Sequence, residues 1–323
     1  MNAITVRFLY ENRGDAFQLE RLTPPELEAR TDIAVSDINR PGFALAGFTE
    51  NFLAERIQIM GQTEMAYLSS VDDAQRREAF ARLFQFPIPC IIVAKGLEPP
   101  QVMIEMAAER NIPVLRTPMS TTPFIHELTS YLEDTFAPTT NIHGSLVDVY
   151  GVGLLITGRS GIGKSECALD LVERGHRLVV DDVVTIKKRQ EGVLLGSASE
   201  LLQHRMEIRG LGIIDIQAIF GIRAIRGQKR IEVEVHLREW NAGEQYERTG
   251  LDERTSTILG VQIPLAIVPI VPGKNLTVIT EVIALNYLVK AYGYNPAQSF
   301  DDLLRSRLER RRHFETLARG DLE

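Results

Sequence analysis

Cysteine and long apolar runs are both scarce in this chain. Its 323 residues include only two cysteines, Cys90 and Cys167. Two cysteines are too few for a cysteine-rich zinc site. Their apolar and helical surroundings are typical of small core residues in a reducing compartment. No apolar run reaches the roughly 18 residues of a membrane helix, and the chain opens on a strand pattern rather than a signal peptide. We therefore expect a cytoplasmic protein with no membrane partner.

An excess of positive charge is also missing. The chain has 36 Lys and Arg against 43 Asp and Glu, a net charge of −7, and its pI is near 5.5. This balance argues against nucleic acid or an anionic membrane as the main partner. With 44% hydrophobic and 24% charged residues, the composition is ordinary for a globular protein. A chain of this length is expected to form two domains.

The amino-terminal part, residues 1–136, alternates strand and helix patterns. Strands are predicted at 4–9, 33–38, 90–93 and 113–115, and helices at 17–22, 63–68, 74–84, 100–110 and 122–136. Alternation at this spacing predicts a small α/β domain with a parallel sheet. No catalytic spacing occurs in it. A Pro/Thr stretch at 137–141 is the best linker candidate.

Residues 137–323 show a different pattern of predicted secondary structure, with many short strands followed by two helices. Strands are predicted at 146–150, 152–157, 177–180, 183–187, 193–195 and 229–237, an apolar stretch at 258–271, and helices at 277–292 and 296–317. The last helix is very basic, which is typical of a solvated helix face. The fold class is therefore α/β: a small N-terminal domain precedes a strand-rich domain that ends in helices.

The clearest motif is the string GRSGIGKS at 158–165, which lies between an apolar strand pattern and a helix pattern. Strand, glycine-rich turn and helix are the context of a phosphate-binding loop. The backbone N–H groups and the positive end of the helix dipole then face the phosphates. The predicted nucleotide-binding residues are Gly158, Arg159, Ser160, Gly161, Ile162, Gly163, Lys164 and Ser165. Lys164 is expected to reach the β- and γ-phosphates, and the Ser165 hydroxyl to bind Mg²⁺.

Two adjacent carboxylates, Asp181 and Asp182, end the next predicted strand. An acid at the end of a strand beside a phosphate loop typically binds Mg²⁺ or orients the attacking group. Because successive side chains point to opposite sides of a strand, each aspartate can have a different role.

A second unusual string, EIRGLGIIDI at 207–216, places charges inside an apolar run. Charges buried in this way are costly unless they pair or hold a metal or phosphate. Glu207 can complete the Mg²⁺ shell, and Arg209 can neutralise a phosphoryl group.

Three more polar residues stand out less. His143 and Arg248 look like a structural histidine and a surface arginine when judged by composition alone. Lys274 precedes a predicted helix, where a cation is unfavourable unless an anion binds there.

Taken together, these motifs resemble the HPr kinase/phosphorylase family, which modifies a serine of the phosphocarrier protein HPr. The resemblance rests on HGSLVDVYG at 143–151, GRSGIGKS at 158–165, GHRLVVDD at 175–182, EIRGLGIIDI at 207–216 and PIVPGKN at 269–275. It implies an ATP- or pyrophosphate-dependent serine kinase that also runs the reverse phosphorolysis with inorganic phosphate. It also implies a homohexamer, an N-terminal domain of regulatory or assembly role, and regulation of the phosphotransferase system.

The resemblance further implies residue roles. Mg²⁺ is held by Ser165 and Glu207, and Asp182, with Asp181 beside it, exchanges a proton with the target serine. His143, Lys164, Arg209 and Arg248 match active-site positions, and the segment 269–274 matches the one tied to dephosphorylation. Val271 is a departure, since family members commonly have a basic residue there, and it makes the phosphorylase efficiency less certain. The alternatives are a P-loop kinase for a small hydroxyl-bearing metabolite and a nucleotide-gated regulatory protein without transfer activity.

Overall fold

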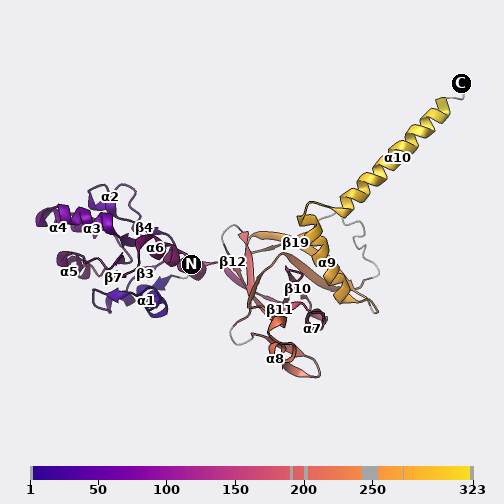
Figure 1. The fold of residues 1–323 in the computed structure, drawn as a ribbon, viewed down its shortest axis with the longest axis horizontal. Coiled ribbons are helices and arrows are strands. Elements are labelled where there is room, and N and C mark those ends of the chain that lie inside the picture. The colour runs from indigo at the N-terminus through magenta and orange to yellow at the C-terminus, as the bar shows by residue number, and fades with distance from the viewer. Residues whose placement is uncertain (1–2, 190–191, 200–202, 242–253, 272, 321–323) are drawn as a thin grey trace. The chain divides into compact units, whose positions relative to one another are not determined.

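In the amino-terminal unit, residues 1–137, helices cover both faces of a five-stranded sheet (Figure 1). The computed structural model describes residues 3–189, 192–199, 203–241, 254–271 and 273–320, with side chains up to 309. The strand order is β2-β7-β6-β5-β4, in which β4 to β7 run parallel. The strands are β1 (Ile4–Thr5), β2 (Glu20–Arg21), β3 (Asp32–Ile33), β4 (Ile38–Asn39), β5 (Ile57–Met60), β6 (Ile91–Val93) and β7 (Val114–Arg116).

The central strands β5 and β6 are largely apolar because both of their faces are buried. Ile91 and Val93 pack among α2 to α5, whereas Ile92 packs on the other face with α1 and α6. The helices are α1 (Val6–Arg13), the short η1 (Leu27–Ala29), α2 (Gly42–Leu45), α3 (Gln62–Ser70), α4 (Asp73–Leu83), α5 (Gln101–Glu109) and α6 (Thr121–Phe136).

Three predictions for this unit are wrong. The predicted strand 33–38 is not one strand, because its two ends belong to β3 and β4, which lie in different sheets. The predicted strand 4–9 is mostly helix α1, because Thr5 caps the helix by accepting a hydrogen bond from the Phe8 N–H at 3.1 Å. The predicted helix 17–22 instead contains strand β2, which pairs with β7. The Phe17 carbonyl there accepts a hydrogen bond from the Thr117 hydroxyl, so this segment is held by the sheet.

The second unit, residues 138–323, contains a six-stranded sheet of order β11-β9-β10-β17-β19-β18, a four-stranded sheet of order β16-β13-β12-β8 and the hairpin β14-β15. Its first strands are β8 (Thr139–His143), β9 (Ser145–Val149), β10 (Val152–Gly158), β11 (Arg177–Val180), β12 (Val183–Lys188) and β13 (Leu194–Ser197). They are followed by β14 (Arg205–Ile208), β15 (Gly212–Asp215), β16 (Gln228–Arg230), β17 (Val233–Glu239), β18 (Thr255–Ile258) and β19 (Val261–Ile270).

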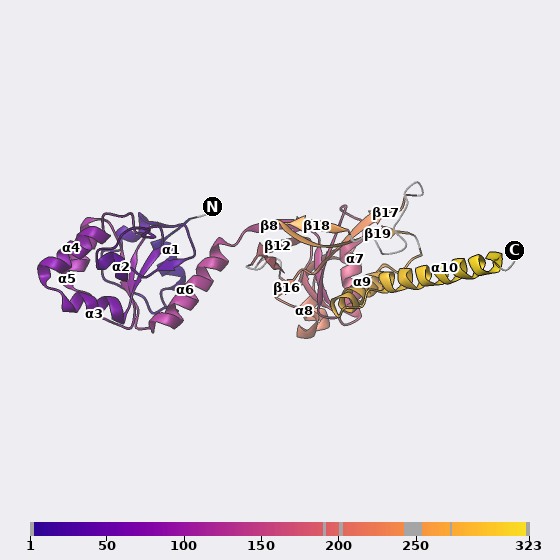
Figure 2. The same ribbon diagram turned by 90° about the horizontal axis from the view of Figure 1, so that it is seen from above.

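Helices α7 and α9 pack on one face of the six-stranded sheet, and the four-stranded sheet covers the other (Figures 1 and 2). Strand β10 divides its side chains accordingly: Leu154 and Ile156 face the helices, and Leu155 faces the second sheet. The helices are α7 (Lys164–Glu173), α8 (Ile216–Phe220), η4 (Ile222–Ala224), α9 (Leu276–Ala291) and α10 (Pro296–Gly320). None of the described helices has the length and apolarity needed to cross a membrane.

Strands β10, β11, β17 and β19 all end at the same edge of the six-stranded sheet. Strand β10 is parallel to β17, and β17 to β19, while β9 is antiparallel to both β10 and β11. The carboxyl end of such a sheet is where ligands bind in open α/β folds.

The structure corrects two further predictions. Most of the predicted linker 137–141 belongs to strand β8, which pairs with β12. The predicted strand 229–237 is broken, because the chain passes there from the four-stranded to the six-stranded sheet. At the break, Glu232 accepts a hydrogen bond from the Gly153 N–H at 2.5 Å.

Candidate functional site

The phosphate loop connects the end of β10 to the start of α7 as predicted. Gly161 and Gly163 have φ angles of +77° and +104°, which glycine adopts at no steric cost. A side chain at Gly161 would also place its Cβ 2.7 Å from a guanidinium nitrogen of Arg209. The Lys164 ammonium donates to the Gly158 and Arg159 carbonyls, each at 3.1 Å. The Lys164 side chain therefore folds back over the loop and contacts its backbone carbonyls.

A pocket of about 210 Å³ joins this loop to two segments that are distant in sequence. It is lined by Ser160, Gly161, Gly163, Lys164, Ser165, Glu166, Asp181, Asp182, Glu207 and Arg209. Its volume is below the roughly 300–1,000 Å³ of sites that enclose a drug-sized ligand. The described lining is therefore sized for phosphoryl groups.

Asp181 lies at the buried side of this pocket. Its carboxylate accepts a hydrogen bond from the Ser145 hydroxyl at 2.5 Å. Burial raises the pKa of Asp181 above its ordinary value, while hydrogen bonds from Ser145 and Ser165 oppose that rise. Strand β9, which carries Ser145, lies between β10 and β11. The aspartate strand is therefore separated from the strand of the phosphate loop by β9, although both aspartates line the pocket beside that loop.

Asp182 has the opposite surroundings. Its side chain is 70% exposed, and His143 Nδ1 lies 3.8 Å from its Oδ1. Its φ of +74° is in the left-handed region, and its carbonyl accepts a hydrogen bond from the Gly144 N–H at 2.9 Å. The β8–β12 pairing thus brings His143 to the rim aspartate, although His143 does not line the pocket as described.

Glu207 and Arg209 reach the pocket from the hairpin β14-β15, but they are exposed rather than buried. The expectation of buried charges is wrong because only some apolar residues of the string face the core, while Leu211 and Ile213 are exposed like the two charges. Met206 enters the core, and Ile208 and Ile214 pack against it. This anchoring leaves the two charged side chains free to face the pocket.

The other predicted residues lie outside the lining as described. The Arg159 guanidinium pairs with Glu239 at 2.6 Å, at the end of β17. Ile162 packs against the core. Lys274 is exposed next to the start of α9. Arg248 falls outside the described residues.

Sequence reasoning missed Ser145, Glu166 and Glu239. Ser145 is the polar first residue of the buried strand β9, and that position was the available signal. Glu166 follows the motif directly, in the first turn of α7. Glu239 carried no signal, because its relation to the loop depends on the pairing of β10 with β17.

The oxygen donors at the pocket fit Mg²⁺. Ser165 and Glu207 both line it, and Mg²⁺ typically takes one or two protein oxygens together with substrate phosphates and waters. The Asp181 carboxylate accepts a hydrogen bond from the Ser165 hydroxyl and can orient that hydroxyl.

The loop, its lysine and the surrounding carboxylates define a P-loop nucleotide-binding protein with the groups of a phosphotransferase. Residues 4–132 match the family described as "HPr Serine kinase N terminus" and residues 134–304 that described as "HPr Serine kinase C-terminal domain". The chain belongs to the HPr serine kinase family, which confirms the resemblance drawn from its motifs.

Named relatives agree with this assignment. The HPr kinase/phosphorylase of Chloroherpeton thalassium is 50% identical over 96% of this chain and 91% of its own length. That of Geobacter sulfurreducens is 48% identical over 85% of this chain and 86% of its own length. The solved Hpr(Ser) kinase/phosphatase from Coxiella burnetii is 34% identical with a TM-score of 0.45, covering 50% of this chain and 98% of that one. The two HPr kinase/phosphorylase relatives favour neither the metabolite kinase nor the nucleotide-gated regulator.

Proposed function

We propose that this protein phosphorylates a serine of HPr, using ATP or pyrophosphate, and catalyses the reverse phosphorolysis of phosphoserine-HPr. One observation carries the proposal. The phosphate loop, the Asp181–Asp182 pair and the Glu207–Arg209 hairpin converge on one phosphate-sized pocket in a chain of the HPr kinase family.

In the forward direction, Lys164 and the loop amides bind the donor phosphates and stabilise the charge that develops during transfer. Asp182 takes the proton of the serine hydroxyl, since its exposed carboxylate at the rim is accessible to a residue on another protein. Asp181 is buried and turned toward Ser165, which suits a positioning role. Ser165 and Glu207 would hold Mg²⁺, which would neutralise phosphate charge when bound.

In the reverse direction, an oxygen of inorganic phosphate attacks the phosphorus of phosphoserine. The bond from phosphorus to the serine oxygen breaks, the serine oxygen takes the proton carried by Asp182, and pyrophosphate forms. Two anions must approach each other, so nearby cations lower the barrier. Arg209 at the pocket, Lys274 in the loop after β19, and Arg248 are assigned this role, with His143 orienting Asp182.

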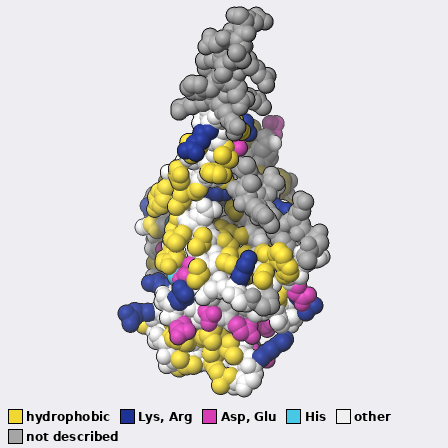
Figure 3. All heavy atoms as spheres, turned by 90° about the vertical axis from the view of Figure 1, so that its right-hand side faces the viewer, with side chains coloured by type: hydrophobic (Ala, Val, Ile, Leu, Met, Phe, Trp, Pro, Cys, Tyr) yellow, Lys and Arg dark blue, Asp and Glu magenta, His cyan; other side chains and the backbone are white. Residues whose placement is uncertain are grey.

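We assign the amino-terminal unit a regulatory or assembly role and the second unit the catalysis, in a cytoplasmic homohexamer. An apolar helix face supports assembly: Val278, Val282, Leu285 and Val289 of α9 are all exposed. Figure 3, which views the molecule from the right-hand side of Figure 1, shows hydrophobic side chains gathered on this face. A contiguous apolar face of this kind marks a contact with another chain.

The direct test uses HPr purified from the same organism. The protein is incubated with labelled ATP and HPr, and then phosphoserine-HPr is incubated with inorganic phosphate. We expect label on an HPr serine in the first reaction and pyrophosphate in the second. Label transfer to small metabolites but not to HPr would contradict the proposal.

A further inference from the structure

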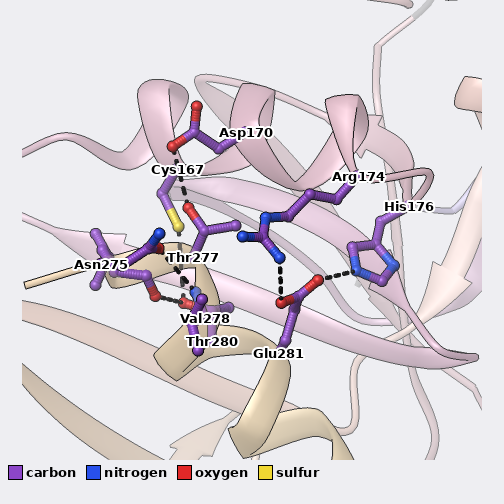
Figure 4. A network of polar contacts seen from close by, with 10 residues as sticks. Cys167, Asp170, Arg174, His176, Asn275, Thr277, Val278, Thr280 and Glu281 are labelled. Atoms are coloured by element: carbon purple, nitrogen blue, oxygen red, sulfur yellow. Dashed lines mark hydrogen bonds and ion pairs between the residues drawn. The ribbon is translucent and has the colours of Figure 1, made fainter.

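A seam of polar contacts joins the helix of the phosphate loop, α7, to the helix that follows β19, α9. Figure 4 shows the side chains of the two helices pointing toward each other. The Thr277 hydroxyl donates to Asp170 at 3.1 Å, and the Cys167 sulfur lies 3.7 Å from the Thr280 hydroxyl. Glu281 accepts from Arg174 at 3.0 Å.

The same Glu281 carboxylate also contacts His176 Nε2, at 3.1 Å, just beyond α7. Thr277, Thr280 and Glu281 occupy positions i, i+3 and i+4 of α9, so they form one face of that helix. All three residues are buried. The buried polar groups of α9 are therefore all paired, as buried polar groups must be, although Asp170 and Arg174 on α7 are exposed.

Polar contacts of this kind add to the constraint that close packing already places on the register of two helices. Each hydrogen bond is satisfied only over a narrow range of distance and angle, so these contacts further restrict sliding and rotation of α9 against α7. The α9 face below Glu281 continues with the buried Ala284 in the apolar core. The seam therefore constrains the alignment of α9 relative to α7, and the apolar core supplies most of the packing between α9 and the rest of the unit.

The amino-terminal end of α9 is also the end of the Lys274 loop. Asn275 caps the helix by accepting a hydrogen bond from the Val278 N–H at 3.0 Å. The other end of the loop is fixed where β19 stops, at Ile270. Strand β19 is two strands from β10 in the sheet. At about 4.8 Å per strand, the two carboxyl ends are about 10 Å apart.

We propose that the polar seam between α7 and α9 positions the Lys274 loop relative to the phosphate loop and thereby serves phosphorolysis. Thr277 and Glu281 are then positioning residues that act through Lys274. The inference rests on the proposed function, in which Lys274 helps to hold the attacking phosphate. It adds to that function the structural elements that place the lysine.

Thr277→Val is the cleanest test, because it removes the hydroxyl and keeps the shape. Its partner Asp170 is exposed, so no charge is left buried without a partner. We expect the KM for inorganic phosphate in phosphorolysis to rise about five-fold, the effect of losing one ordinary hydrogen bond. The kinase reaction should change less than two-fold. Thr277→Ser should restore the wild-type KM.

Two further variants separate positioning from general packing. In a double-mutant cycle, Thr277→Val should add little to Lys274→Ala, because both act on the same lysine. Ile283→Val, a core change elsewhere on α9, should leave the ratio of the two activities unchanged. Additive losses, or equal losses in both directions for Thr277→Val, would overturn the inference.

Hydrogen exchange gives a readout that does not depend on activity. Amides from 273 to 279 should exchange faster in Thr277→Val than in the wild type, while those of β10 should not change. Unchanged exchange overturns the positioning role even in an active enzyme. Absence of phosphorolysis by the wild type overturns the proposed function instead, so the two failures are distinguishable.

Discussion

At the scale of single residues, the site separates two neighbouring carboxylates by their surroundings. Asp181 is buried behind Ser165, and burial raises its pKa, whereas Asp182 lies at the open rim with His143 beside it. An exposed carboxylate is accessible to the hydroxyl of a protein substrate, whereas the buried carboxylate of Asp181 accepts hydrogen bonds from Ser145 and Ser165. These different surroundings support the different roles that we propose for the two aspartates.

We predict that Asp182→Asn keeps ATP binding but lowers HPr phosphorylation by about 10²–10⁴-fold, the usual contribution of a positioned general base. Equilibrium binding of ATP and single-turnover transfer rates are measured separately. A collapse of affinity with an unchanged rate on bound ATP would assign Asp182 to metal binding or structure, and Asp181 would become the better candidate for the base.

Lys164→Ala should abolish transfer from both ATP and pyrophosphate, a loss of at least about 10²-fold. The ammonium neutralises phosphate charge in the transition state, and no neutral side chain replaces it. Circular dichroism and thermal melting check that the variant is folded. A folded variant with full activity in either direction would refute this role.

The chemistry-bearing residues could be found from sequence because each lies in a dense motif. GRSGIGKS, the two aspartates and the Glu207–Arg209 string all reach the same pocket. Their surroundings could not be predicted. The contact of Arg209 with Gly161 and the hydrogen bond from Ser145 to Asp181 join segments whose pairing only the folded sheet determines.

At the scale of elements, local signals identified most helices and strands, and tertiary contacts explain the failures. Over residues 4–9 the apolar spacing fits both a strand and a helix, and the Thr5 cap favours the helix. Over 229–237 the alternation is clean, but the chain changes sheets at Glu232. Strand order was also beyond local reasoning, since β9 inserts between β10 and β11 through antiparallel pairing.

The loop after β19 gives a prediction about direction of reaction. Phosphorolysis must hold a free inorganic phosphate next to phosphoserine, and the forward reaction has no such second anion. We expect Lys274→Ala to impair phosphorolysis about five- to ten-fold more than phosphorylation, as one lost charge pair in a solvated site implies.

Val271→Arg is the complementary change and should raise phosphorolysis at low phosphate concentration. Initial rates in both directions, across a phosphate titration, measure both variants. Equal losses in the two directions for Lys274→Ala would mean that the loop serves HPr docking in general.

At the scale of the whole molecule, the exposed apolar face of α9 is the surface that we propose to contact another copy of the chain. If the proposed homohexamer uses this face, Val282→Asp should shift the protein to smaller species at micromolar concentration, because a carboxylate buried in an apolar contact is unfavourable. Val282→Thr, which keeps the shape without a charge, is the control. Analytical ultracentrifugation reports the masses, and an unchanged mass for Val282→Asp would place assembly on another surface.

The left-handed backbone at Asp182 implies a trade between activity and robustness. A non-glycine residue in that region costs about 1 kcal/mol, and the Asp182 carboxylate also repels Asp181. We therefore expect Asp182→Gly to be inactive yet more resistant to heat, with a melting temperature about 2–4 °C higher. A lower melting temperature by scanning calorimetry would contradict this. Selection for thermal resistance alone would then favour glycine at position 182. The aspartate there is explained by its proposed role in catalysis.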